Sequence, residues 1–401
     1  MMIGYYKEKG YEIVNNPEEA EILVINTCGF IESAKKEAID TILEMADYKS
    51  KNCKKLIVTG CLVERYKEEL EKALPEVDLF IPIKEYDKIF DKLDYMKRTI
   101  TTGQNYAYLR IADGCSNYCT YCAIPYIRGP LKSRTLEDVL EEAKRLSKEG
   151  YKEIILVAQD TARYGMDIYG ESKLVELLKE LCKLDFKWIR FLYAYPEMIT
   201  DELIDVVANN EKICNYFDIP IQHISDTVLK RMGRKSNGAS IREVIKKIRN
   251  KIPDVVIRTS LIVGFPGEKE SDFDELYSFV KETKFERLGV FKYSKEEGTP
   301  AVKLKEQIPE ERKEERYDQI MSLQQEVSAE NNQKIIGQKL ECIIDGLTDD
   351  GEMYVTRSYR DVPDTDGFVF VNKEKEHKVG DFIECIVKEA YEYDLTAKEL
   401  K

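Results

Sequence analysis

The chain has 401 residues, of which 43% are hydrophobic, so it can form ordinary cores in two or three domains. Its net charge of −13 at pH 7 gives no general attraction to nucleic acid or to an anionic membrane. No run of eighteen apolar residues occurs, and the N-terminus lacks the regions of a signal peptide. The sequence therefore predicts a cytoplasmic protein with no membrane partner. Two histidines exclude a His-rich metal site.

Residues 1–100 predict a doubly wound α/β domain. The predicted elements are a helix at 1–9, a strand at 11–14, a buried strand at 22–25, a helix at 33–45, a strand at 56–58 and a helix ending near 74. Cys28 and Cys61 each follow a predicted parallel strand, at the end where such sheets place ligands. They are either ligands or buried core thiols. Cys53, in a Lys-rich loop, is predicted to be an incidental surface thiol.

Three cysteines, Cys115, Cys119 and Cys122, lie close together on one predicted loop. Thiolates so spaced can ligate zinc or an iron–sulfur cluster. A structural zinc ion needs four ligands, and no fourth Cys or His is near, so three thiolates better fit a four-iron cluster with one open iron. A disulfide scaffold conflicts with an odd count in a long acidic chain. Chance clustering is the remaining alternative.

The three-cysteine spacing, with Tyr121 just before the last Cys, resembles the cluster motif of the radical S-adenosylmethionine (SAM) enzymes. The resemblance implies that the open iron holds the amino and carboxylate groups of SAM. It also implies that an electron from the cluster cleaves SAM to a 5′-deoxyadenosyl radical. The protein would then supply placement and exclusion of water.

Residues 101–333 predict a partial (β/α)6 barrel of the TIM type, which the motif identifies as a radical SAM barrel. The predicted strands are 107–111, 154–157, 189–193, 216–219, 255–262 and 288–291. The predicted helices between them are 136–148, 172–183, 201–209, 240–250 and 272–283. Thr135, Thr200 and Ser271 are predicted to cap three of these helices. Each strand is followed by residues suited to a site, which favours chemistry at these tips.

Candidate SAM contacts lie at three of the tips. Gly264 and Gly267 allow a backbone to approach a ligand closely, and the Gly264 region resembles the family's fifth-strand contact to the adenosyl group. A strand-to-helix turn that needs glycine is the alternative. Gln159 and Gln222 offer uncharged hydrogen-bonding groups for SAM, or else bond at the surface. His223 is left without a role.

The tail begins with a charged segment, in which a helix around 317–331 is predicted to pack across the barrel. Residues 334–401 predict a small β-barrel with strands 340–344, 353–357, 367–371 and 382–389. This barrel resembles the TRAM domain, which usually binds RNA. Residues 335–401 contain nine Lys or Arg against sixteen Asp or Glu, a net charge of −7, which argues against direct nucleic-acid binding.

The order of the three domains resembles the methylthiotransferases, and the likeness covers essentially the whole chain. The segments 156–161, 219–226 and 357–361 resemble the branch that modifies ribosomal protein uS12. That branch places a methylthio group on the β-carbon of an aspartate. The resemblance implies two 4Fe–4S clusters, SAM used as methyl donor and radical source, and a reductant protein of flavodoxin or ferredoxin type. Cys115, Cys119 and Cys122 would hold the first cluster, and Cys28 and Cys61 part of the second.

Two other functions remain open at this point. A tRNA adenosine methylthiotransferase would use the same chemistry but predicts a basic C-terminal barrel. A non-catalytic iron–sulfur electron carrier or RNA-binding adaptor would not need residues suited to a site after each of the six barrel strands.

The start of the chain departs from the family pattern. The family's first domain carries a third cluster cysteine on a strand-end loop before the helix that corresponds to residues 1–9. We expect a strand and a cysteine to be missing, so that Ile3, Tyr5 and Tyr6 lack the sheet they should cover. Cys53 precedes its strand and cannot substitute. The second cluster should then be incomplete and weakly held.

Overall fold

A computed structural model describes residues 1–86, 95–103 and 105–400. The chain forms two compact units. The first unit consists of Met1–Ile100, Gly114–Pro130 and Ser294–Lys303. The second consists of Thr101–Asp113, Leu131–Tyr293 and Leu304–Lys401. The loop that carries the three clustered cysteines therefore belongs to the first unit.

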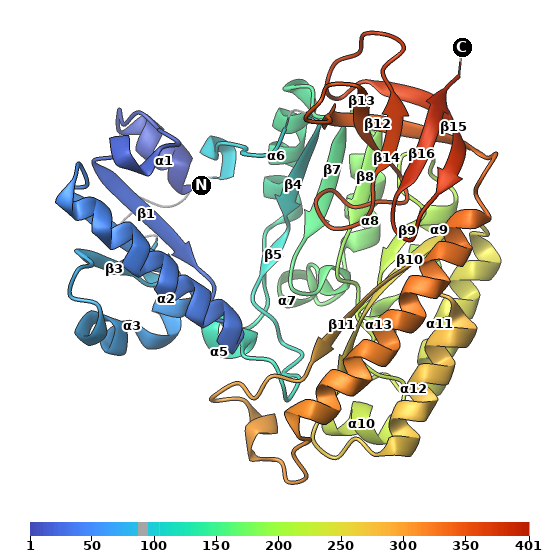
Figure 1. The fold of residues 1–401 in the computed structure, drawn as a ribbon, viewed down its shortest axis with the longest axis horizontal. Coiled ribbons are helices and arrows are strands. Elements are labelled where there is room, and N and C mark those ends of the chain that lie inside the picture. The colour runs from blue at the N-terminus through green and yellow to red at the C-terminus, as the bar shows by residue number, and fades with distance from the viewer. Residues whose placement is uncertain (87–94, 104, 401) are drawn as a thin grey trace. The chain divides into compact units, whose positions relative to one another are not determined.

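The first unit is built on a parallel sheet in the order β1-β2-β3, with helices on both faces (Figure 1). Its elements are α1 (Met2–Glu8), β1 (Ile22–Thr27), α2 (Glu32–Ala46), β2 (Lys55–Gly60), α3 (Cys61–Ala73), β3 (Leu79–Ile81) and α5 (Ile124–Arg128). Val58 and Phe80 pack with α2 and α3, whereas the alternate residues Ile57 and Ile81 pack with α1. Successive strand residues point to opposite faces, so helices on both sides are required to bury them. The doubly wound prediction is confirmed.

Several details of the first unit differ from the prediction. Residues 11–14 form no strand, and Tyr11 and Val14 are exposed because no neighbouring strand pairs with them. β1 is an edge strand of this sheet and is only half-buried. Cys53 is buried rather than on the surface. The chain turns back there, since the Cys53 amide donates to the Tyr48 carbonyl.

Helix α1 does cover the sheet. Met2, Tyr5 and Tyr6 pack against the face formed by Ile57 and Ile81. The expectation that Tyr5 and Tyr6 lack a sheet partner is therefore wrong. Their aromatic rings fill the face that α2 and α3 leave open.

In the second unit, six parallel strands occur near the positions predicted for the partial barrel. They form two three-stranded sheets, β4-β7-β8 and β9-β10-β11, joined by a parallel bridge between Ile189 and Ile213 (Figure 1). Their bounds are β4 (Tyr106–Arg110), β7 (Glu153–Val157), β8 (Trp188–Phe191), β9 (Tyr216–Asp218), β10 (Val256–Val263) and β11 (Arg287–Lys292). A short antiparallel pair comprises β5 (Ala112–Asp113) and β6 (Lys132–Ser133). The partial barrel is confirmed.

Helices connect these strands, as βαβ units require. They are α6 (Leu136–Lys148), α7 (Met166–Tyr169), α8 (Leu174–Leu181), α9 (Asp201–Ala208), α10 (Asp226–Arg231), α11 (Gly238–Lys251) and α12 (Glu270–Thr283). Thr135 and Thr200 accept amide hydrogen bonds as N-caps of α6 and α9, as predicted. The predicted cap at Ser271 is wrong. The N-cap of α12 is Lys269, whose amide donates to the Asp272 carboxylate instead.

The C-terminal part of the second unit is a long helix, α13 (Glu310–Gln333), followed by a closed five-stranded barrel. The helix packs along β11 and α12 and reaches β15, which confirms that it lies across the barrel. The strands are β12 (Lys339–Leu347), β13 (Met353–Ser358), β14 (Val369–Asn372), β15 (Phe382–Ala390) and β16 (Leu395–Glu399). The sequence prediction missed β16, since only Leu395 and Ala397 in it are buried and apolar.

The small barrel covers the N-terminal ends of the large barrel's strands. Trp188, Tyr216 and Val256, which begin β8, β9 and β10, pack against Ile343 and Val362 of the small barrel. The C-terminal strand tips, where the site is predicted, are therefore at the other end of these strands. No helix in the described part of the chain is both long and apolar enough to cross a membrane.

Candidate functional site

Cys28 and Cys61 lie at the same edge of the sheet in the first unit. Each directly follows a strand, and the last residues of these strands, Thr27 and Gly60, are paired across the sheet. The Thr27 hydroxyl donates to the Thr59 carbonyl at 2.6 Å, which fixes the same edge. Cys28 is exposed and Cys61 is buried. Two thiols at one end of a parallel sheet agree with the prediction of a ligand site there.

Two glycines allow the two cysteine segments to come so close. A Cβ atom on Gly29 would lie 2.7 Å from the backbone of Leu62, the residue after Cys61. Gly60 has a φ of +103°, and a Cβ on it would lie 2.3 Å from the Thr27 carbonyl oxygen. Any other residue would push the two strand ends apart.

The loop with Cys115, Cys119 and Cys122 is compact and mostly buried. The Cys115 amide donates to the Gly129 carbonyl at 3.1 Å, and the Cys122 amide donates to the Cys119 carbonyl at 3.0 Å. Cys115 and Cys119 are 6% and 4% exposed. Burial, together with the neighbouring Cys119 and Cys115, raises the pKa of the Cys122 thiol to about 12. Thiolates would therefore require a cation beside them.

The donor set on this loop suits an iron–sulfur cluster. All ten cysteines are free of disulfides, so the three thiols are available as soft ligands. No group of three His, Cys, Asp or Glu side chains in the described part of the chain could hold a single metal ion. The prediction of an iron–sulfur cluster rests on the three soft thiol ligands that this loop carries.

Two arginines that the sequence reasoning missed lie beside the strand-end cysteines. Arg128, at the end of α5, donates from Nη2 to the Cys61 sulfur at 3.4 Å. Arg65, on α3, donates from Nη1 to the carbonyl of Gly29 at 2.9 Å, next to Cys28. Arg128 follows Cys122 by six residues, and this spacing alone gave no sign that it reaches Cys61.

The predicted SAM contacts all belong to the second unit, at the tips of three strands. Gln159 follows β7, and no described residue donates to its buried Oε1. Gln222 has a left-handed backbone with φ of 70° and is held by its amide, which donates to the Ser260 carbonyl. Non-glycine residues adopt this conformation rarely, and functional sites hold many of those that do. The SAM roles of Gln159, Gln222 and Gly264 stay predictions.

The two glycines after β10 serve packing. A Cβ on Gly264 would lie 2.2 Å from Cγ of Lys313, and a Cβ on Gly267 would lie 2.0 Å from Nη1 of Arg231. The space beside both glycines is thus filled by side chains of α13 and α10. The close approach of a ligand to the backbone of these glycines stays a prediction.

Two buried titratable residues, Glu268 and His223, stabilise the loops that follow β10 and β9. Burial raises the pKa of Glu268 to about 7, although its carboxylate pairs with Arg316 at 3.0 Å. Its other oxygen accepts from the Phe265 amide, which ties the Gly264 loop to α13. Burial lowers the pKa of His223 to about 3, so the ring is neutral, and its Nδ1 accepts from the Ser225 amide. This bond orients the His223 ring in the turn after β9.

Asp218, at the end of β9, is a further buried acid that the sequence reasoning did not single out. Its carboxylate accepts from the Tyr193 amide at 3.0 Å and lies 3.5 Å from the Arg258 guanidinium. Burial raises its pKa to about 6, because Arg258 offsets only part of the desolvation. Tyr193 has φ of 60° and is 42% exposed. Asp218 thus holds an aromatic residue in an unfavourable conformation at the third strand tip.

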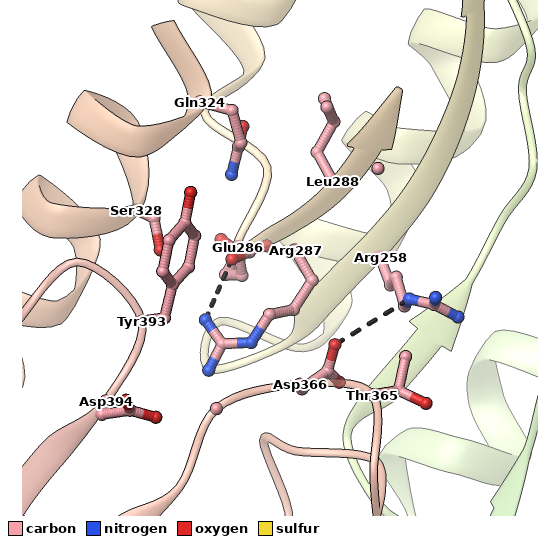
Figure 2. A pocket seen from close by; sticks show the side chains of 12 residues that line it. Arg258, Glu286, Arg287, Leu288, Gln324, Ser328, Thr365, Asp366, Tyr393 and Asp394 are labelled. Atoms are coloured by element: carbon pink, nitrogen blue, oxygen red, sulfur yellow. Dashed lines mark hydrogen bonds and ion pairs between the residues drawn. The ribbon is translucent and has the colours of Figure 1, made fainter. Parts of the chain in front are cut away.

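A polar cavity lies at the other end of these strands, under the small barrel. Its volume is ≈ 280 Å³, and Figure 2 shows Arg258, Arg287, Gln324 and Asp366 around it. Among the described residues, none bonds to the buried Oε1 of Gln324 or Nε of Arg287. A cavity of this size and polarity can hold ordered water. It lies away from the strand tips and is not part of the predicted site.

Comparisons with known proteins agree with this division of the chain. Residues 109–280 match the radical SAM superfamily, residues 1–82 match the uncharacterized protein family UPF0004, and residues 336–399 match the TRAM domain. A solved radical SAM methyltransferase, TsrM from Kitasatospora setae, has a TM-score of 0.54 at 12% identity. The match covers 71% of this chain and 66% of that one. This likeness concerns the fold alone.

Two curated relatives carry the name ribosomal protein uS12 methylthiotransferase RimO. The protein of Alkaliphilus oremlandii (strain OhILAs) is 59% identical, over 98% of this chain and 94% of its own length. The protein of Clostridium tetani (strain Massachusetts / E88) is 50% identical, over 98% of this chain and 93% of its own length. Such identity over nearly the whole length, together with the radical SAM and TRAM matches, shows that this chain belongs to the RimO family of radical SAM methylthiotransferases.

Proposed function

We propose that this protein transfers a methylthio group to the β-carbon of an aspartate in ribosomal protein uS12. The observation that carries the proposal is the presence of two thiol sites in one compact unit. One site is the loop with Cys115, Cys119 and Cys122, and the other is the pair Cys28 and Cys61. A radical enzyme that inserts sulfur needs a place to generate the radical and a second place to hold the sulfur. The names of the relatives support the choice of substrate.

The first cluster of this proposal is a 4Fe–4S cluster on Cys115, Cys119 and Cys122. When bound, it would supply the electron that cleaves SAM, and the radical released from SAM would remove a hydrogen atom from the substrate carbon. The chain's own residues fix the loop through the Cys115–Gly129 and Cys122–Cys119 backbone bonds and bury the thiols from water. Gln159, Gln222 and Gly264 are the residues we propose for SAM.

The second cluster would be held by Cys28 and Cys61. Cys53 precedes β2, at the opposite end of the sheet, so it offers no third thiolate at that edge. Among the described residues, Cys28 and Cys61 are therefore the two thiolates that we propose for this cluster.

The proposed division of labour follows the three predicted domains. Residues 1–100 hold the second cluster, residues 101–333 form the radical SAM core with SAM, and residues 334–401 form the TRAM-like barrel. The protein would work in the cytoplasm and take electrons from a flavodoxin or ferredoxin type of reductant.

The decisive test is a reaction with a defined peptide. Anaerobically reconstituted and reduced protein is incubated with SAM and a peptide from uS12 that contains the target aspartate. Mass spectrometry should show one added methylthio group on that aspartate. A peptide with Asn in place of the Asp is the matched control and should stay unmodified. Cleavage of SAM without any change of the Asp peptide would contradict the proposed substrate.

The charge of the small barrel gives a second test of substrate class. With a net charge of −7 over residues 335–401, it should attract a basic ribosomal protein and repel tRNA. Binding of uS12 should weaken as salt rises from 0.05 to 0.5 M, by about one order of magnitude or more, because surface charges are screened. Tight tRNA binding at physiological salt without uS12 binding would favour the tRNA adenosine branch instead.

A further inference from the structure

Arg128 joins the two thiol sites of the first unit. It ends α5, the helix that begins two residues after Cys122, and its Nη2 donates to the Cys61 sulfur at 3.4 Å. The two residues are 67 positions apart in the sequence. A distance of 3.4 Å is suitable for an N–H donor and a sulfur acceptor, which is larger than oxygen.

The surroundings hold Arg128 in this position. Ala123 and Ile127 of the same segment pack against Cys61, together with Phe30 and Ile83. Ala123 and Ile127 are 1% and 5% exposed, so one face of α5 is anchored in the unit. Arg128 itself is half-buried. A guanidinium reaching a thiol from an anchored helix keeps its geometry better than one on a mobile loop.

A second guanidinium supports the partner cysteine. Arg65 donates to the Gly29 carbonyl and lies 3.7 Å from the buried Glu296 carboxylate. Glu296 also accepts from the amide of Glu32, the first residue of α2. The Cys28 turn is therefore held through its backbone, whereas Cys61 is contacted at its sulfur. Arg128 is the group placed to act on the ligand atom itself.

We infer that Arg128 is a positioning residue for the sulfur cluster that Cys61 is proposed to ligate, so this inference rests on the proposed function. The N–H donor fixes the direction of the Cys61 sulfur. Its positive charge offsets the negative charge of a thiolate-bound cluster, which stabilises the bound and the reduced states. Hydrogen bonds to cluster sulfurs and local charge set reduction potentials, and partners of ligands affect affinity. Arg128 would thereby couple the loop after Cys122 to the second cluster.

The test isolates the second site in the full chain. A background variant, Cys115→Ala with Cys119→Ala and Cys122→Ala, removes the first cluster, so reconstituted iron reports on Cys28 and Cys61 alone. Arg128→Gln and Arg128→Lys are made in that background. Tyr126→Phe, an exposed position on the same helix, is the matched control. The two readouts are iron retention against a chelator and the midpoint potential followed by electron paramagnetic resonance.

We expect Arg128→Gln to lower iron affinity by about 10- to 100-fold, the usual effect of losing a ligand's hydrogen-bond partner, and to lower the midpoint potential. Arg128→Lys should restore part of the potential, because it keeps the charge without the planar fork. If Arg128→Gln equals Tyr126→Phe in iron retention and midpoint potential, the role of Arg128 is wrong. That result would leave the proposed second cluster itself unaffected. If the background variant binds no iron, the proposed second cluster is wrong, and so is this role of Arg128. SAM cleavage by the unmodified chain tests the first cluster separately.

Discussion

At the scale of single residues, burial decides what each ionisable group can do. Burial raises the pKa of the Cys122 thiol, which disfavours the free thiolate. Burial keeps His223 neutral, and it raises the pKa of Glu268 to about 7 and that of Asp218 to about 6. Groups with shifted pKa values gather at functional sites, and Glu268 and Asp218 lie after or at the end of strands of the large barrel. Their positions agree with chemistry at the strand tips.

The clearest single-residue prediction concerns the first cluster. Cys119→Ala should abolish reductive cleavage of SAM, because one ligand of a loop-bound cluster is lost. The fold should stay largely intact, since no disulfide depends on this thiol. The measurement is 5′-deoxyadenosine production, with circular dichroism as a check of folding. Cys182→Ala, at the end of α8, is the control and should cleave SAM normally. Undiminished production by Cys119→Ala would refute the assignment.

Asp218 makes a pH-dependent contribution to stability. Its folded pKa of about 6 lies above the ordinary value of 3.8, so the folded state binds the proton more tightly. The free energy of unfolding therefore falls as the pH rises from about 4 through 6, and the full cost is present at pH 7. Asp218→Asn should remove this fall. Between pH 4 and pH 7, the free energy of unfolding of this variant should rise by about 3 kcal/mol relative to the wild type. This is the energy that corresponds to a shift of roughly two pKa units.

Denaturant titrations at several pH values measure this difference. The exposed Asp349→Asn is the control for the loss of a surface carboxylate. A constant difference for Asp218→Asn would show that the carboxylate is ionised at no cost in the folded state.

At the scale of elements, the site depends on where strands end. β1 and β2 stop in register at Thr27 and Gly60, and this places a cysteine after each at the same height. α3 begins at Cys61 and α5 packs against it. The strand ends thus place two cysteines at one edge of the sheet, and the packing of α5 brings Arg128 to the Cys61 sulfur. A shift of either strand end by one residue would separate the thiols.

Gly29→Ala tests this arrangement. The new Cβ would lie 2.7 Å from the Leu62 backbone, which cannot move without shifting α3. We expect a loss of about 1–3 kcal/mol in the free energy of unfolding of the first unit. Gly346→Ala in β12 is the control, because nothing lies within 4 Å of its Cβ position, and its cost should stay within about 0.5 kcal/mol. Equal stabilities of the two variants would contradict the close-approach argument.

At the scale of the whole molecule, buried ion pairs tie the small barrel to the large one within the second unit. Glu153, the first residue of β7, accepts from Arg190 at 2.9 Å and from Arg357 of β13 at 2.6 Å. All three side chains are at most 1% exposed. Trp188 and Phe382 stack edge to face beside them, with ring centres 4.9 Å apart. The small barrel is therefore an integral part of this unit.

Arg357→Met should destabilise the second unit by about 3–5 kcal/mol, because it leaves charges of the network buried and incompletely compensated. Thermal or denaturant unfolding measures the change. Glu202→Gln, which breaks an exposed ion pair with Lys179, should change stability by at most about 1 kcal/mol. If Arg357→Met is as mild as Glu202→Gln, the small barrel is not held by this network.

The sequence by itself determined the elements and the ligand chemistry. Hydrophobic periodicity and turn residues act over a few positions, so the six barrel strands and most helices could be predicted. Strand β16 and the α12 cap could not, because they depend on pairing partners and on the Asp272 side chain. The spacing of Cys115, Cys119 and Cys122 is likewise local and pointed to a cluster.

Only the tertiary structure decided which distant residues meet. The burial of Cys53, the filling of the space beside Gly264 by Lys313 and the packing of Tyr5 and Tyr6 on the sheet follow from how elements pack. The contact of Arg128 with Cys61 spans 67 positions and has no local signal. Such contacts are set by complementary surfaces of whole elements, and periodicity along the chain does not contain that information.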